Sequence, residues 1–216
     1  MRWIRLILLM VVARPLARLL IGCDVLGPGR LPKRGPAIVA ANHNSHVDTL
    51  LLLSLFPAEA LRFVRPVAAA DYFLAGPVIG WVSRHLIGIV PIERDQAGTG
   101  KDVLAPAREA LIAGDIVVIF PEGTRGDAKD RLGPLKSGVA HLAAAVPDCP
   151  VYPVWIQGAG RVLPKGGRLP TPMTCCAVVG VPLTFGGDRA VFMGVLKDSL
   201  DALKAEAPPL RWVDQD

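Results

Sequence analysis

Two side chains that can exchange protons stand close together near the start of the chain. His43 and Asp48 directly follow the apolar run from Ala37 to Ala41, which is typical of a buried strand that ends at a turn. A histidine there can take a proton from an alcohol through Nε2 while an aspartate holds its Nδ1 proton. On one continuous helix the two side chains would point ~140° apart. We therefore expect His43 on a turn and Asp48 in the first turn of the following helix, where an anion is favoured.

The same segment allows two other interpretations. Asn42, His43 and Asp48 could simply orient a turn, since local side-chain hydrogen bonds of this kind are common. His43, His46 and Asp48 could instead form a metal triad. No further cluster of metal-ligating residues is obvious in the sequence. We predict no metal, and we expect His46 at a pocket rim or in the first helical turn.

A second segment, Phe-Pro-Glu-Gly-Thr-Arg-Gly at residues 120–126, follows the most clearly apolar strand, residues 115–120. Ligands of α/β sheets bind in loops at the carboxyl ends of strands. Arg125 can grip a phosphate in a bidentate manner, Glu122 supplies a carboxylate, and the glycines let the backbone approach a ligand. The alternative is a solvated turn with an internal salt bridge.

Two more cations could join this loop. Arg94 follows the apolar run of residues 88–92, and Lys136 lies just ahead of a helix whose first amides favour an anion. Either residue alone would more often be an ordinary surface charge.

The elements that position these residues alternate between strand and helix along the chain. This order predicts an α/β fold with a mixed, largely parallel central sheet flanked by helices. Pro91 indicates an edge strand or a bulge. The predicted strands are residues 36–41, 61–67, 88–92, 115–120, 151–156 and 174–181, and the predicted helices are 46–56, two short ones within 72–86, 102–113, 137–146 and 191–205.

Composition favours a lipid surface as partner. The 216 residues fit one domain, 51% of them are hydrophobic, and the formal net charge is +5. A basic, apolar protein fits a surface that meets anionic lipid. Nucleic acid is the other usual partner of a basic chain, but no Lys/Arg run stands out and aromatic residues make up only 6%. We therefore predict no nucleic-acid partner.

The N-terminal segment is apolar but interrupted. The run from Leu6 to Ala13 is short, and Arg14, Pro15 and Arg18 follow it, so it is too broken for a simple transmembrane helix. We predict a membrane-interfacial helical segment at residues 1–23, a Gly/Pro-rich linker at 24–35 and the main domain at 36–216. A cleaved signal peptide and an ordinary docking helix are the alternatives.

The four cysteines predict no metal site and no disulfide framework. They do not form a C-x-x-C pair, so we expect reduced, buried thiols. Cys175 and Cys176 are neighbours in a predicted strand and should face opposite sides of the sheet.

Taken together and in order, these segments resemble the glycerolipid acyltransferases of the 1-acylglycerol-3-phosphate (lysophosphatidic acid) acyltransferase type. The stretch from Asn42 to Asp48 matches the family's first motif, N-H-x4-D, and Phe120 to Arg125 matches the third. Residues 88–94 look like the second motif and residues 151–154 like the fourth. The likeness covers residues 36–185.

The resemblance implies a reaction and a set of site residues. A fatty acyl group would pass from acyl-CoA or acyl carrier protein to the hydroxyl of a lysophospholipid, with His43 as base, Asp48 as its orienting partner and no cofactor. It also implies a peripheral or monotopic place on the cytoplasmic face of the cell membrane. Glu93 departs from the familiar second motif, so a different acceptor, such as a lyso-ornithine lipid, stays open, as does a non-catalytic lysolipid-binding module. The candidate substrate-binding residues are Arg94, Glu122, Gly123, Thr124, Arg125 and Lys136.

Overall fold

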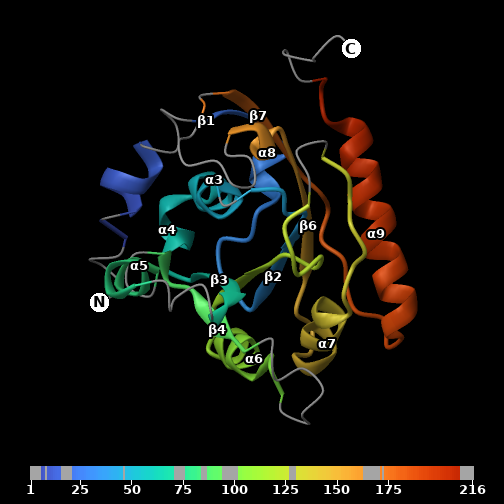
Figure 1. Cartoon of the computed structure of the whole chain (residues 1–216). Helices are drawn as coiled ribbons and strands as arrows, with labels where there is room; N and C mark the ends of the chain where they lie inside the picture. Colours follow the sequence, from blue (N-terminus) through green and yellow to red (C-terminus); the bar gives the residue numbers. More distant parts are fainter. Residues whose placement is uncertain are drawn as a thin grey trace.

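A seven-stranded sheet with helices on both faces forms the centre of the molecule (Figure 1). The structure is a computed structural model that describes residues 6–7, 9–15, 21–45, 47–70, 76–83, 87–93, 102–126, 130–162, 171 and 173–209. The strand order is β1-β7-β6-β2-β5-β3-β4. The strands are β1 (Ile21–Leu26), β2 (Ala37–Ala41), β3 (Val64–Ala69), β4 (Val90–Ile92), β5 (Ile116–Ile119), β6 (Val151–Gln157) and β7 (Met173–Val179).

The sheet is mixed and mostly parallel, as predicted. β6 and β7 are antiparallel, and the other neighbouring pairs run parallel. Every residue of β2 and β5 is buried, because helices cover both faces of a parallel sheet. β4 is the last strand in the order, which confirms the edge position that Pro91 indicated.

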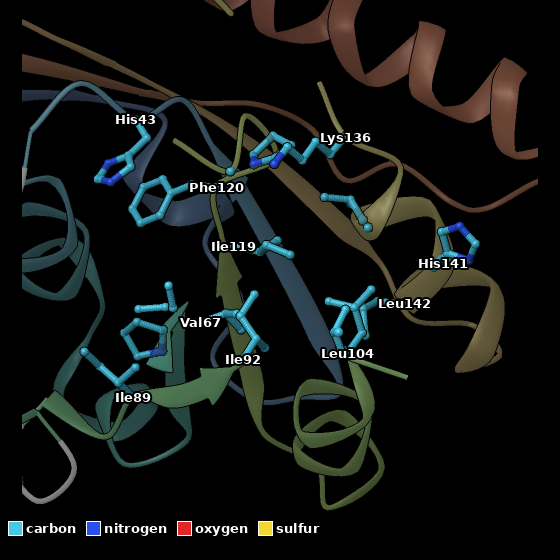
Figure 2. Close-up of a pocket in the computed structure, with 18 of the residues that line it drawn as sticks. His43, Val67, Ile89, Ile92, Leu104, Ile119, Phe120, Lys136, His141 and Leu142 are labelled. Carbon is cyan, nitrogen blue, oxygen red and sulfur yellow. The ribbon is translucent and has the colours of Figure 1, made fainter. Parts of the chain in front are cut away.

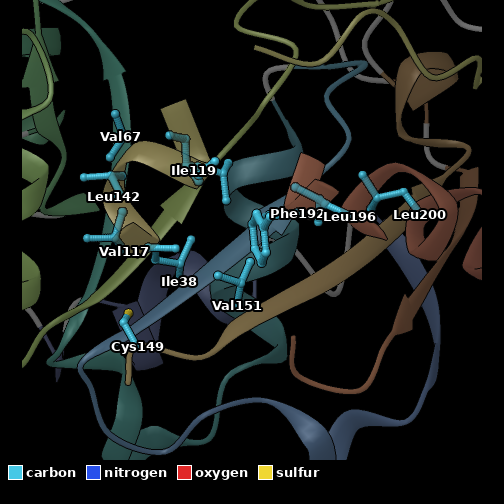
Figure 3. Packing of buried hydrophobic residues seen from close by; sticks show 14 of the residues in the cluster. Ile38, Val67, Val117, Ile119, Leu142, Cys149, Val151, Phe192, Leu196 and Leu200 are labelled. Atoms are coloured by element: carbon cyan, nitrogen blue, oxygen red, sulfur yellow. The ribbon is translucent and has the colours of Figure 1, made fainter. Parts of the chain in front are cut away.

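Alternating side chains of the strands build two apolar cores. On one face Val39, Val118 and Ile156 pack with residues of α3 (Val47–Leu55), α4 (Ala58–Leu61) and α8 (Ala159–Val162). On the other face Ile38 and Val117 pack with residues of α6 (Ala105–Ile112), α7 (Gly138–Ala145) and α9 (Arg189–Glu206) (Figures 1 and 3). The prediction for the paired cysteines is confirmed, since Cys175 lies in the first core and Cys176 in the second.

The N-terminal boundary differs from the prediction. Residues 21–23, predicted to be helical, and residues 24–26, predicted to be a linker, together form β1, which runs parallel to β7. Gly22 and Asp24 are poor strand formers, so the local sequence gives little sign of a strand. The pairing partner, Cys175 opposite Cys23, lies some 150 residues further along the chain. A 3-10 turn, η2 (Pro28–Arg30), follows the strand.

The described part of the N-terminal segment contains a short π-helix, η1 (Leu9–Ala13). Leu9 is buried in the first core, while Ile7 and Val11 are 60% and 68% exposed. No helix among the described residues is long and apolar enough to cross a membrane. Attachment of this segment to a membrane surface stays a prediction.

Three short helices complete the described fold. α4 and α8 were not predicted, because each spans four residues and shows no helical period. α4 ends at Leu61, where the second predicted strand was expected to begin, so this strand, β3, starts at Val64 rather than Leu61. α5 (Pro77–Val82) lies within the range of residues 72–86 that was predicted to hold two short helices. Residues 72–75 and 84–86 of that range lie outside the described residues.

Candidate active site

The two sequence motifs meet where β2 and β5 end. These strands are direct parallel neighbours, with Ala40 opposite Ile119, so the residues that follow them emerge side by side. The ring of His43 stacks on the ring of Phe120, with centroids 4.1 Å apart and planes inclined by 20° (Figure 2). The edge formed by the carboxyl ends of parallel strands is where α/β folds bind ligands.

His43 and Asp48 form the pair that their spacing predicted. Nδ1 of His43 lies 2.9 Å from Oδ2 of Asp48, with His43 on the turn and Asp48 in the first turn of α3. Asp48 is fully buried, and the same oxygen accepts hydrogen bonds from the backbone N–H groups of Asn44 (2.7 Å) and Ser45 (2.8 Å). A carboxylate at Nδ1 assigns the proton to that nitrogen and leaves Nε2 as the acceptor.

Asn42 fixes the start of this turn. Its Nδ2 donates to the carbonyl of Ile156 at 2.8 Å, and its Oδ1 accepts from the N–H of the same residue at 2.6 Å. The side chain therefore continues the pairing of β2 with β6 beyond the end of the strand. Asn42 thus orients the turn, the role that one interpretation of the sequence gave to Asn42, His43 and Asp48 together.

Glu122 is hydrogen-bonded to the turn that carries His43. Its Oε1 accepts from the N–H of His43 at 2.9 Å and its Oε2 from the N–H of Gly133 at 3.1 Å. Burial raises the pKa of the Glu122 carboxyl, and the two backbone hydrogen bonds oppose that rise. Glu122 is not among the residues that line the cavity described next. Its contact with substrate stays a prediction.

A cavity of about 1410 Å³ opens beside His43 (Figure 2). This volume exceeds the roughly 300–1,000 Å³ that a single small ligand usually occupies, so it suits two substrates or a lipid. The His43 end also presents Gly123, Thr124, Arg125 and Lys136. Its apolar walls include Val67, Ile89, Ile92, Leu104 and Leu142.

Lys136 lies directly over the loop of the third motif. Gly123 has a φ of 70°, and a Cβ there would come within 2.9 Å of Nζ of Lys136. The backbone N–H of Lys136 donates to the carbonyl of Pro121 at 2.8 Å, and α7 begins two residues later. None of the described carboxylates pairs with Lys136 or Arg125. Both cations are therefore available to an anionic ligand.

The structure brings most of the predicted site residues together. His43, Gly123, Thr124, Arg125 and Lys136 line one cavity, and Asp48 and Glu122 support it from behind. Arg94 and His46 lie outside the described residues. Among the residues that are described, no cluster of three His, Cys, Asp or Glu side chains could hold a metal ion.

Sequence reasoning missed two parts of the site. His141, from the first turn of α7, also lines the cavity. Asp130 contacts the turn that carries His43, since its Oδ1 accepts from Nδ2 of Asn44 at 2.7 Å. The second contact joins residues 86 positions apart, so no local spacing could have indicated it.

An imidazole held by a buried carboxylate lies at the edge of a large cavity that also presents two cations without a described carboxylate partner. Such an imidazole can take a proton from a hydroxyl group bound beside it. Comparison with known proteins gives the family. Residues 23–157 match the family described as Acyltransferase, and the chain belongs to that family.

Two similar proteins are both named as acyltransferases, with different acceptors in their names. The chain is 36% identical over 147 residues to "1-acyl-sn-glycerol-3-phosphate acyltransferase BAT2, chloroplastic" of Brassica napus, covering 67% of this chain and 40% of that protein. It is also 36% identical to the "Lyso-ornithine lipid O-acyltransferase" of Rhizobium meliloti, over 65% of this chain and 46% of that one. The chain thus spans less than half the length of these two relatives.

A solved structure extends the likeness to nearly the whole chain. The crystal structure of the 1-acyl-sn-glycerophosphate (LPA) acyltransferase, PlsC, from Thermotoga maritima matches with a TM-score of 0.70 at 26% identity. The match covers 93% of this chain and 80% of that one. The family resemblance read from the motifs is confirmed.

Proposed function

We propose that this protein transfers a fatty acyl group from a thioester donor to the free hydroxyl of 1-acylglycerol-3-phosphate, forming phosphatidic acid for phospholipid biosynthesis. The observation that carries the proposal is the His43–Asp48 pair, 2.9 Å apart, with the imidazole at the wall of a lipid-sized cavity. The names of the similar proteins support the same reaction class.

The chemistry follows from the orientation of the imidazole. Nε2 of His43 takes the hydroxyl proton while the oxygen attacks the thioester carbonyl. The tetrahedral intermediate then collapses, the C–S bond breaks, and the thiolate takes the proton back from the imidazolium. Asp48 stabilises the imidazolium without itself being protonated. Base assistance of this kind contributes ~10²–10⁴ in rate.

The acceptor phosphate would sit at the cationic end of the cavity. Lys136 lies against Gly123 there, Arg125 lines the same cavity, and neither cation is paired with a described carboxylate. A phosphate held by these groups sets the distance between the acceptor hydroxyl and Nε2, which converts encounter into a near-intramolecular reaction. Arg94 would complete the cationic set, as the resemblance implies.

The apolar walls would take acyl chains, and the donor would be acyl-CoA or acyl carrier protein. A second acceptor is favoured by a specific observation, since one similar protein is named for lyso-ornithine lipid. Because that acceptor lacks a phosphate, it would form fewer ion pairs with Arg125 and Lys136. We therefore place 1-acylglycerol-3-phosphate first.

The protein would work at the cytoplasmic face of the cell membrane, bound peripherally or monotopically. The exposed apolar side chains of Ile7 and Val11 and the formal net charge of +5 support contact with anionic lipid.

A panel of donors against acceptors tests the proposal. Purified protein is incubated with acyl-CoA or acyl carrier protein and either lysophosphatidic acid, lyso-ornithine lipid or another lysophospholipid, and free thiol and acylated product are measured. We expect turnover that requires the phosphate-bearing acceptor and is indifferent to chelators. Binding of lysolipid without turnover on any donor would indicate a non-catalytic module instead, and loss of turnover with a chelator would indicate a metal enzyme.

A further inference from the structure

Asp130 is a buried carboxylate that the reaction does not use directly. It is 7% exposed and is absent from the cavity lining. Its Oδ1 accepts from Nδ2 of Asn44 at 2.7 Å, and its Oδ2 accepts from the N–H of Gly158 at 3.0 Å. Asp130 therefore links the turn that carries His43 to Gly158, the residue that follows β6.

Burial of the Asp130 carboxyl disfavours its charged form. Desolvation raises the pKa of Asp130, while the hydrogen bonds from Gly158 and Asn44 and the charge of Arg161 lower it. An apolar side chain could fill the same space without that cost. Unlike an apolar side chain, the carboxylate orients its neighbours, because each of its two oxygens holds one hydrogen-bond donor in a fixed position.

The contact reaches the catalytic pair through one residue. Asn44 uses its side chain on Asp130 and its backbone N–H on Oδ2 of Asp48, the oxygen that faces Nδ1 of His43. A shift of Asn44 would therefore move a donor away from the oxygen that aims the imidazole.

Gly126 closes the other side of Asn44. A Cβ at Gly126 would come within 2.8 Å of Oδ1 of Asn44, so the glycine lets the loop lie directly against the amide. The N–H of Gly126 also donates to the carbonyl of His43 at 2.7 Å. Asn44 is thus held between a packed backbone and one strong side-chain hydrogen bond.

We propose that Asp130 is a positioning residue, which orients Asn44 so that the backbone amide of Asn44 keeps Asp48 aimed at His43. The inference rests on the proposed acyl transfer for its kinetic test and on the hydrogen bonds themselves for a second test.

The kinetic test compares Asp130→Ala with Asp130→Asn. In Asp130→Ala we expect kcat to fall about 10- to 100-fold, the factor that corresponds to a lost charge-assisted hydrogen bond, with the KM of each substrate nearly unchanged. Asp130→Asn should recover most of kcat. It keeps an acceptor for Gly158, and its amide can pair with that of Asn44 once the latter turns over.

A double-mutant cycle shows whether the effect runs through Asn44. Asn44→Ala alone should lower kcat by a similar factor, and Asn44→Ala combined with Asp130→Ala should be no slower than either single variant. Losses that simply multiply would mean that Asp130 acts independently of Asn44 and would overturn the proposal.

Asp115 supplies a matched control. It is also a buried carboxylate, 4% exposed, but it pairs with Arg65 at the opposite end of β5. Asp115→Ala should lower the Tm and leave kcat unchanged. If Asp130→Ala behaves in the same way, its role is stability alone and the proposal fails.

Amide hydrogen exchange gives a readout that needs no substrate. Exchange at Asn44 and Ser45 should accelerate in Asp130→Ala and not in Asp115→Ala, because only the first variant releases the turn. Unchanged exchange in Asp130→Ala would refute the inference even if the protein transfers no acyl group. An active wild type with unaltered kcat in Asp130→Ala would refute it while the proposed function stands.

Discussion

At the scale of residues, one oxygen atom organises the candidate active site. Oδ2 of Asp48 receives the Nδ1 of His43 and the backbone amides of Asn44 and Ser45. Three converging donors fix the position of the carboxylate, which in turn favours the imidazole tautomer that a general base needs.

Asp48→Asn tests this arrangement. An amide in place of the carboxylate would present a donor to some of these groups and would no longer stabilise an imidazolium, so kcat should fall at least ~10²-fold. The KM of the lysolipid should change little, because Asp48 is fully buried and does not line the cavity. Initial rates of thiol release give both constants. A variant with near wild-type kcat would show that the pair is only structural.

The sequence predicted this pair because spacing alone required a turn followed by a helix. It could not predict what Glu122 does. An acidic residue in a glycine-rich loop suggests a ligand contact, and only the folded chain shows its two oxygens on the amides of His43 and Gly133. Hydrogen bonds across 79 and 11 positions leave no periodic trace in the sequence.

At the scale of elements, the pairing of β2 with β5 brings the His43 turn and the loop of residues 120–126 together. Gly123 of this loop lies against the Lys136 side chain. Gly123→Ala should disturb this loop. The left-handed conformation costs ~1–2 kcal/mol for a residue with a Cβ, and the new methyl would meet the Lys136 side chain. We expect the KM of the acceptor to rise about 5- to 30-fold, the factor equivalent to that energy.

The control for this variant is Gly186→Ala, where a Cβ would meet nothing within 4 Å. Its kinetics should equal those of the wild type. An unchanged acceptor KM in Gly123→Ala would argue against a phosphate site on this loop.

The same loop predicts a pH dependence of stability. Burial raises the pKa of Glu122 above its ordinary value of 4.5, so the folded protein keeps this proton to a higher pH than the unfolded chain does. The protonated Glu122 carboxyl therefore adds its full stabilisation to the unfolding free energy below pH 4.5. This stabilisation is lost as the pH rises through the raised pKa. Urea unfolding measured at increasing pH above 4.5 should show a smaller decline in the unfolding free energy in Glu122→Gln than in the wild type. Parallel curves would contradict this.

The order of strands and helices could be predicted because strands buried on both faces consist of continuous apolar residues, which are visible in the sequence. β2 and β5 are short apolar runs bounded by turn residues, and α9 has a regular apolar stripe of Phe192, Leu196, Leu200 and Leu203. β1 could not be predicted from the sequence, since Gly22 and Asp24 are poor strand formers and its pairing partner β7 is remote along the chain.

At the scale of the whole molecule, the proposed contact with a membrane surface rests on the net charge and on the exposed apolar side chains of the N-terminal segment. η1 and α9 lie on opposite sides of the sheet (Figure 1). Ile7→Ser combined with Val11→Ser should weaken binding to anionic vesicles about tenfold or more, because each exposed side chain would lose apolar burial in the lipid. Leu9 is left in place because it belongs to the core.

The matched control is Val191→Ser combined with Val195→Ser on α9, where the side chains are 65% and 46% exposed. These changes should leave vesicle sedimentation unaltered. Equal losses in both double variants would mean that general hydrophobicity, rather than the N-terminal segment, governs binding. Wild-type binding should also weaken as salt is raised.

The most direct test of the whole account compares His43→Ala with Lys197→Ala in the transfer of an acyl group from acyl-CoA to lysophosphatidic acid. Lys197 is an exposed residue on α9, paired with Asp201, and serves as the surface control. Phosphatidic acid formation should fall ~10²–10⁴-fold in His43→Ala and stay at the wild-type rate in Lys197→Ala. Full activity in His43→Ala would contradict the assignment of this imidazole as the base.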